Sequence, residues 1–108
     1  IMTYQDLGPK EFKAAYESTP DAVLIDVRTP AEIAESNIEG YIAINFNDAS
    51  FPAKILEMDK DKTLFLYCRS GNRSSTAGDM LTRLRFSNVY NVLGGIYSRE
   101  SSGEPQVK

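Results

Sequence analysis

The stretch Leu64-Phe65-Leu66-Tyr67-Cys68-Arg69-Ser70-Gly71-Asn72-Arg73-Ser74 joins an apolar run to the single cysteine of the chain. The run up to Tyr67 predicts a strand. From about Arg73, apolar residues recur at helical spacing, at Ala77, Met80, Leu81 and Leu84. A loop between a strand and a helix start gathers backbone N–H groups and lies at the positive end of the helix dipole. The stretch therefore predicts an anion-binding loop with a cysteine at its mouth.

Cys68 has neighbours typical of a reactive thiol. Most lone cysteines are buried and inert. Here, however, Arg69 and Arg73 lie close in the sequence, and arginines seldom surround an inert core cysteine because they need water or a carboxylate. Cations and a helix start lower the pKa of a thiol, so we expect Cys68 to be a nucleophilic thiolate within reach of solvent.

Composition limits the kinds of site that the chain can hold. Its 108 residues suffice for one modest core, and a net charge of −3 argues against nucleic-acid binding. The absence of histidine excludes Ser-His, Cys-His and most zinc sites, and a single cysteine excludes an internal disulfide. No apolar run reaches the roughly 18 residues of a membrane helix. We therefore expect one domain over residues 1–108, with no metal, organic cofactor, nucleic-acid or membrane partner.

The start of the chain bears on its compartment. No signal peptide is visible, although Ile1 before Met2 indicates a trimmed or altered start. We expect a soluble protein, with the cytoplasm as the favoured compartment. A periplasmic or organellar location would require that a leader had been removed.

Strand-like and helix-like segments alternate along the chain. Short apolar runs predict strands at residues 2–4, 22–27, 41–46, 63–67 and 88–93. Helices are predicted to begin at Pro9, Pro30, Ala53, Arg73 and about Ile96. Residues 59–62 are expected to form a charged surface turn, and residues 101–108 a frayed tail. Such alternation with short links predicts an α/β fold with a parallel sheet, right-handed crossovers and helices on both faces.

Two of the helix starts have specific capping patterns. Gly8 suits an N-cap and Pro9 the first helical position, while Leu7 and Phe12 have the spacing of a hydrophobic staple. Thr29-Pro30-Ala31-Glu32 has the pattern of a capping box with proline at the first helical position. We expect the first of these helices to end at residues 19–21 and the second near residue 37.

The loop Cys68-Arg69-Ser70-Gly71-Asn72-Arg73-Ser74 resembles the active-site loop of single-domain members of the rhodanese family of sulfurtransferases. Residues 24–32 and 38–45 are similar to the first motif of that family and its continuation, and residues 91–96 to its closing motif. The resemblance implies a single rhodanese-like domain with a five-stranded parallel sheet in the order 1-5-4-2-3. It also implies that Cys68 lies at the carboxyl ends of the strands, where such sheets bind ligands.

Some positions depart from the pattern of the family. Ser36-Asn37 stands in place of a frequent Gly-His, Tyr41 in place of a small residue, and Arg99 in place of tryptophan. These positions lie outside the loop. They therefore bear on stability and on the walls of the site, and so on substrate identity more than on the chemistry.

The resemblance implies transfer of sulfane sulfur in two halves. The Cys68 thiolate would attack the outer sulfur of a small anionic donor such as thiosulfate and become a persulfide. A thiophilic acceptor would then take the sulfur: cyanide in an assay, or a thiol or partner protein in the cell. The N–H groups of residues 69–73 would cradle the developing negative charge. Arg69 would attract the donor, and Arg73 would fix the loop and add a positive field.

Four further residues are expected to support the site. Asp26 could assist proton transfer from the end of its strand. The favoured interpretation is structural: Asp26 and Arg28 pair to satisfy each other and to anchor the following helix. Gly94 and Gly95 are expected to permit a tight turn beneath the site.

Two alternatives to sulfur transfer remain open. A cysteine phosphatase or arsenate reductase also holds a thiolate in an anion loop. The loop between Cys68 and Arg73 is one residue shorter than the phosphatase loop, however, and Ser74 stands where the phosphatase arginine would fall. The other alternative is a non-catalytic binding or sulfur-relay module with the same fold, although inactive members of the family generally lose the cysteine.

Overall fold

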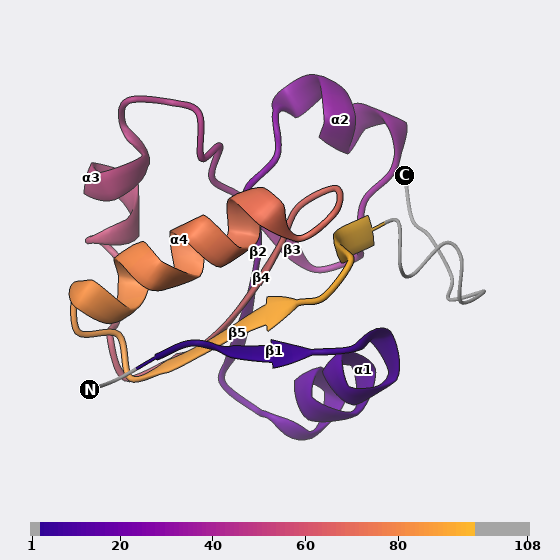
Figure 1. The fold of residues 1–108 in the computed structure, drawn as a ribbon, viewed down its shortest axis with the longest axis vertical. Coiled ribbons are helices and arrows are strands. Elements are labelled where there is room, and N and C mark those ends of the chain that lie inside the picture. The colour runs from indigo at the N-terminus through magenta and orange to yellow at the C-terminus, as the bar shows by residue number, and fades with distance from the viewer. Residues whose placement is uncertain (1–2, 97–108) are drawn as a thin grey trace.

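Residues 3–96, which this computed structural model describes, form a five-stranded parallel sheet with helices on both faces (Figure 1). The strands are β1 (Gln5–Leu7), β2 (Ala22–Asp26), β3 (Tyr41–Ala43), β4 (Thr63–Tyr67) and β5 (Asn88–Val92). They lie in the order β1-β5-β4-β2-β3, and each neighbouring pair is parallel. The α/β class and the strand order expected from the resemblance are therefore confirmed.

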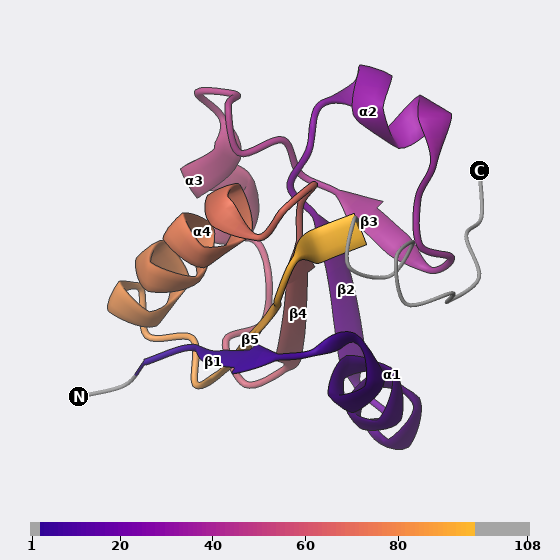
Figure 2. The same cartoon turned by 45° about the vertical axis from the view of Figure 1, so that its right-hand side comes forward.

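The helices divide between the two faces of the sheet. Figure 2 shows α1 (Pro9–Ser18) on one side, and α3 (Phe51–Ile55) with α4 (Asn72–Arg83) on the other. The short helix α2 (Pro30–Glu35) follows β2 and stands at the end of the sheet where β2 stops. None of the helices within residues 3–96 is both long and apolar enough to cross a membrane.

The central strand β4 decides which face Cys68 occupies. Successive side chains of a strand point to opposite faces. Leu64, Leu66 and Cys68 accordingly belong to the apolar cluster that includes residues of α3 and α4. Phe65 and Tyr67 belong to the other cluster, with residues of α1. Cys68 therefore continues the alternation of β4 and points toward the side covered by α4.

Several boundaries differ from those expected. The first strand is Gln5–Leu7 and not residues 2–4, because β1 is an edge strand that begins where its register with β5 begins. The strand expected at residues 41–46 ends at Ala43, although the N–H groups of Ile44 and Phe46 still donate to backbone carbonyls. The helix expected from Ala53 begins at Phe51, since Pro52 suits a first helical turn.

The helix starts with capping patterns are formed as expected. Gly8 is the N-cap of α1, with Pro9 in its first turn, and the helix ends at Ser18. The second helix ends at Glu35 and not near residue 37, because Ser36 is already extended. Gly95 and Ile96 begin the helix expected near residue 96, and the expected tail at 101–108 lies outside the described residues.

Candidate active site

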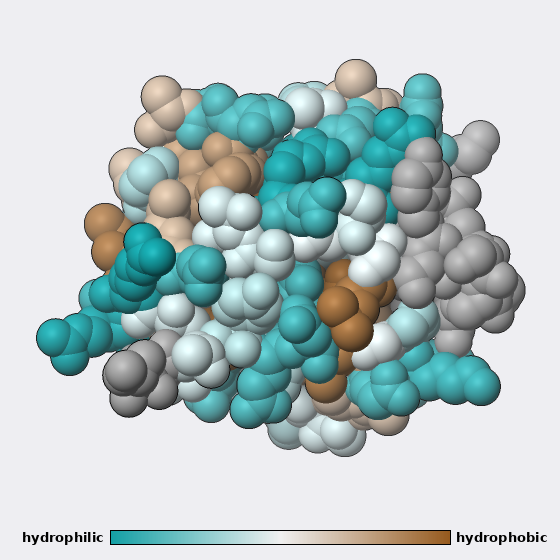
Figure 3. Space-filling view, viewed as in Figure 1, coloured by the Kyte–Doolittle hydropathy of each residue, from teal (hydrophilic) through white to brown (hydrophobic). Residues whose placement is uncertain are grey.

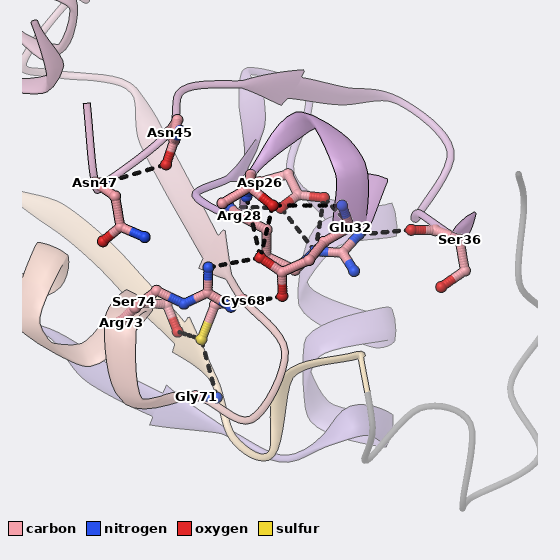
Figure 4. Close-up of polar contacts among 11 residues, drawn as sticks. Asp26, Arg28, Glu32, Ser36, Asn45, Asn47, Cys68, Gly71, Arg73 and Ser74 are labelled. Carbon is pink, nitrogen blue, oxygen red and sulfur yellow. Dashed lines mark hydrogen bonds and ion pairs between the residues drawn. The ribbon is translucent and has the colours of Figure 1, made fainter. Parts of the chain in front are cut away.

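The loop between β4 and α4 folds its backbone toward the sulfur of Cys68. The N–H of Gly71 donates a hydrogen bond to Cys68 Sγ at 3.1 Å (Figure 4). Gly71 is the N-cap of α4 and has φ 102°, a left-handed conformation that favours glycine. A Cβ at this position would also lie 3.2 Å from the backbone nitrogen of Gly94. Glycine is therefore what allows the loop to turn an amide onto the sulfur.

The environment of Cys68 favours its ionised form. Burial is the largest single influence and raises the pKa of the thiol. Hydrogen bonds from the Ser74 hydroxyl and from the N–H groups of Ser74, Gly71 and Ser70 together bring the pKa below its ordinary value. The pKa of Cys68 is thus lowered, as expected. The groups that lower it most are a ring of amides and a hydroxyl, and not the neighbouring guanidinium groups.

The expectation that solvent reaches Cys68 is wrong for this arrangement of the loop. The residue is only 1% exposed, because its side chain points into the α4 side of the core and the loop amides converge on it. Arg69, Ser70 and Asn72 are exposed on the outside of the same loop. A donor can therefore reach the sulfur only when groups of the loop or its surroundings shift.

The turn at Gly94 and Gly95 packs directly against the loop. Both glycines have positive φ, 71° and 56°, as a tight turn requires. The N–H of Ile96 donates to the carbonyl oxygen of Cys68 at 3.0 Å. A Cβ on Gly95 would lie 2.3 Å from that same oxygen. The turn thus holds the backbone of Cys68 through a contact that only glycine permits.

Arg73 is fixed by a carboxylate from another helix. Its two terminal nitrogens donate to the two oxygens of Glu32, each at 2.8 Å (Figure 4). The hydrogen bonds from Arg73 lower the pKa of Glu32 from an ordinary 4.5 to about 2. Glu32 also closes the capping box of α2 with Thr29, as the sequence predicted. Sequence reasoning assigned Glu32 to the cap alone and missed its bond to the loop.

Asp26 and Arg28 form a buried pair, with exposed fractions of 0% and 3%. The Nε and Nη2 atoms of Arg28 donate to the Asp26 carboxylate at 2.8–3.2 Å. Nη2 also donates to the carbonyl oxygen of Ser36, just after α2, at 2.6 Å. These bonds satisfy both charges and tie the two ends of the α2 segment to β2. The geometry agrees with the structural interpretation of the pair.

Asn91 is a site residue that sequence reasoning missed, and Ser74, which ends the quoted loop, was given no role there. Ser74 Oγ lies 3.4 Å from Cys68 Sγ and 2.5 Å from Asn91 Oδ1, and Asn91 Nδ2 donates to Asp6 Oδ1 at 3.0 Å. Ser74 and Asn91 are 0% and 2% exposed. One signal could have found Asn91: it is a polar residue in a predicted buried strand, and such residues need a partner.

A cavity beside α2 touches the supporting residues only at Arg28 and does not include the loop of Cys68. It has a volume of about 730 Å³ and lies between α2 and the β3 edge of the sheet. Its walls include Pro30, Ile33, Tyr41 and Ala43, but not the loop from Cys68 to Ser74. We place the candidate active site at Cys68 because the converging amides and the perturbed thiol are there.

Comparison with known proteins identifies the family. The family model of the Rhodanese-like domain matches residues 8–101. The chain belongs to this family. A protein named sulfurtransferase from Allochromatium vinosum is 37% identical over 82% of the chain and 81% of its own length. The rhodanese-related protein of Thermoplasma volcanium has a solved structure with a TM-score of 0.83, at 28% identity, covering 96% of this chain and 98% of that one.

Relatives in the rhodanese-like family carry more than one kind of name. The thiosulfate sulfurtransferase GlpE of Pseudomonas syringae is 34% identical over 88% of the chain and 86% of its own length. The tRNA uridine(34) hydroxylase of Cytophaga hutchinsonii is 37% identical over 94% of the chain, but the chain spans only 34% of that protein. The sulfurtransferases of Allochromatium vinosum and Pseudomonas syringae are covered over more than four-fifths of their length, whereas the hydroxylase is a much longer protein.

Proposed function

We propose that this rhodanese-like protein moves sulfane sulfur from an anionic donor such as thiosulfate to a thiophilic acceptor through a persulfide on Cys68. The single observation that carries the proposal is the hydrogen bond from Gly71 N–H to Cys68 Sγ, within a ring of amides at the start of α4. Amides that stabilise a thiolate also stabilise the terminal sulfur of a persulfide, which carries the same negative charge.

The first half-reaction forms the persulfide. The Cys68 thiolate attacks the outer sulfur of thiosulfate, and a sulfur–sulfur bond forms to Sγ. The sulfur–sulfur bond of thiosulfate breaks at the same time, and its electron pair leaves with sulfite. The product carries its negative charge on the outer sulfur, next to the amides of Ser70, Gly71 and Ser74 that surround Sγ.

The second half-reaction restores the thiolate. The acceptor attacks the outer sulfur of the persulfide, and the electron pair of the breaking bond returns to Cys68 Sγ. Cyanide would become thiocyanate, and a thiol or a partner protein would become a persulfide. In this scheme exposed Arg69 attracts the donor, while Arg73 is held by Glu32 and keeps the start of α4 in place.

Burial of Cys68 adds a requirement to this scheme. Since the residue is 1% exposed, loop groups must shift as donor and acceptor approach. We expect brief outward movement of the exposed rim formed by Arg69 and Ser70, because the side chains of this part of the loop contact water. Both half-reactions would then pass through the same opening.

Intact mass spectrometry after brief exposure to thiosulfate tests the covalent step. We expect a gain of about one sulfur atom that cyanide reverses, and no gain in Cys68→Ser. A thiosulfate:cyanide assay run beside a phosphomonoester assay separates sulfur transfer from phosphatase chemistry. Turnover that survives in Cys68→Ala would refute the covalent route. A binding module would instead keep its partner affinity in Cys68→Ser and show no sulfur transfer in the native chain.

A further inference from the structure

The Ser74 hydroxyl has one proton and two neighbours that can accept it. Cys68 Sγ is 3.4 Å from Ser74 Oγ, and Asn91 Oδ1 is 2.5 Å away. All three residues are buried. A hydroxyl donates only one hydrogen bond. The sulfur and the amide oxygen therefore compete for the same proton.

Asp6 decides which atom of Asn91 faces Ser74. The Asp6 carboxylate can only accept hydrogen bonds when ionised, so the NH₂ group of Asn91 must turn toward it, as the 3.0 Å contact requires. The amide oxygen of Asn91 then points at Ser74, and this oxygen can only accept. Ser74 is therefore the donor whenever the short contact with Asn91 is a hydrogen bond, and its proton is then not available to the sulfur. In the hydrogen-bonded series Ser74–Asn91–Asp6, each residue donates to the next one, from Ser74 toward Asp6.

This direction has a consequence for the thiol. While Ser74 donates to Asn91, only the lone pairs of its oxygen face Cys68, and these can accept from a thiol S–H but repel a thiolate. To stabilise the thiolate, the hydroxyl must turn toward the sulfur and leave Asn91 Oδ1 without its buried donor. Ionisation of Cys68 therefore carries the cost of the Ser74–Asn91 hydrogen bond.

We propose that Asn91, oriented by Asp6, competes with the Cys68 sulfur for the Ser74 proton and so sets how readily the thiol ionises. Asn91 and Asp6 are thus positioning residues that act through Ser74. The competition for the proton does not depend on the proposed function. Its role in catalysis does, because that role requires Cys68 to be the nucleophile. A hydroxyl that can turn between the two acceptors would give its hydrogen bond to the sulfur when the negative charge is there.

Other charges lie around the site, and a variant that keeps all of them isolates the effect of the hydrogen bonds. They are Arg69 in the loop, Arg73 on α4 with its partner Glu32 on α2, the buried pair Asp26 and Arg28 at the end of β2, and Asp6 on β1. A substitution at Asn91 changes none of these charges. The titration of Cys68 in such a variant therefore reports the hydrogen bonds and not the field.

The experiment measures the pKa of Cys68 from the pH dependence of thiolate absorbance and of alkylation by iodoacetamide. The chain has a single cysteine, so alkylation reports Cys68 alone, and the absorbance of Cys68→Ser is subtracted to remove the contribution of the six tyrosines. We expect Asn91→Leu to lower the pKa by about half a unit to one unit, because the Ser74 proton passes to the sulfur without a competitor. We expect Ser74→Ala to raise it by about one unit, because the thiolate loses its hydroxyl donor.

The double variant is the decisive arm. In the Ser74→Ala background, Asn91→Leu should leave the pKa unchanged, because Asn91 acts only through the missing hydroxyl. An equal shift in both backgrounds would overturn the proposal. Asn88→Leu, the same change at an exposed position of β5, is the matched control and should not alter the titration.

Asp6→Ala provides a second test that does not depend on a buried substitution, because Asp6 is exposed. Without Asp6 the Asn91 amide can turn its NH₂ group toward Ser74, so we expect the thiol pKa to fall. In the Ser74→Ala background only the change in field from the lost carboxylate should remain, so the shift should be smaller. A shift of the same size in both backgrounds would be a charge effect alone and would overturn the proposal. Neither readout uses a sulfur donor, so these results stand apart from those of the thiosulfate mass experiment.

Discussion

At the scale of single residues, backbone conformation determines what can surround Cys68. Gly95 has φ 56°, and a Cβ there would lie 2.3 Å from the Cys68 carbonyl oxygen. We expect Gly95→Ala to lower the free energy of unfolding by more than the roughly 1–2 kcal/mol that alanine costs in a left-handed conformation, because the turn must also move away from the loop. We also expect loss of sulfur transfer, since the backbone of Cys68 moves with it.

A matched glycine separates backbone strain from the contact with Cys68. Gly40 also has positive φ, 93°, but a Cβ there would meet only the end of the Tyr16 side chain. Denaturant unfolding of Gly40→Ala should show the strain alone, with sulfur transfer retained. Equal loss of activity in the Gly40 and Gly95 variants would contradict this account. It would mean that stability, and not the geometry at Cys68, limits the activity.

The residues of the site differ in how far sequence reasoning could reach them. Cys68 and its loop were predictable because a strand, a glycine and a helix start follow one another locally. The Ser74–Asn91 contact joins residues 17 apart, and the Asn91–Asp6 contact joins residues 85 apart. No local pattern records such contacts. The sequence also predicted that solvent reaches the thiol, because the neighbouring arginines suggested an exposed site. It did not show that the loop amides and α4 would close over the sulfur.

At the scale of elements, one ion pair joins the start of α2 to the start of α4. Glu32 has its pKa lowered from 4.5 to about 2 by Arg73, so its contribution to stability is present above pH 4.5 and is lost as the pH falls toward 2. Both side chains are about one-quarter exposed, at 25% and 26%. We therefore expect a discounted loss, on the order of 2 kcal/mol, between pH 5 and pH 2.

Denaturant unfolding as a function of pH measures this loss. Glu32→Gln should remove most of the acid-dependent part while retaining much of the cap, because glutamine also serves in a capping box. Glu35→Gln, on the exposed surface of the same helix, should keep the native pH dependence. If the free energy of unfolding depends on pH in the same way in both variants, the ion pair of Glu32 with Arg73 is not the source of the acid-dependent loss.

The elements themselves were largely predictable, for reasons that differ between them. The strands β2 and β4 are continuous apolar runs because both faces of the sheet are covered, and both appear within one residue of the expected bounds. The edge strand β1 is only three residues long and has no comparable signal. The α3 boundary was missed because Pro52 was not recognised as a residue of a first helical turn.

At the scale of the whole molecule, the sheet divides the core into two clusters that hold the site differently. The cluster facing α4 contains Leu66 and Cys68, and the one facing α1 contains Leu24 and Phe65. Cys68 and its donor Ser74 thus belong to the α4 side of the sheet, while the α1 side supports the sheet from beneath. A substitution that creates a cavity on the α4 side should therefore change both the stability and the pKa of the Cys68 thiol. A cavity on the α1 side should change the stability alone.

Leu66→Ala and Leu24→Ala form a matched pair for this test, since both leucines lie in paired central strands and are at most 1% exposed. Each should cost about 2–5 kcal/mol in the free energy of unfolding, because each leaves a cavity that the core fills only in part. Only Leu66→Ala should raise the pKa of Cys68, because α4 can then settle toward the cavity and carry the Ser74 donors away from the sulfur. Both pKa values are measured by iodoacetamide alkylation at a temperature where both variants remain folded. Equal pKa shifts in the two variants would show that the thiol responds to the packing of the whole core, and a shift confined to Leu24→Ala would reverse the assignment of the site to the α4 side.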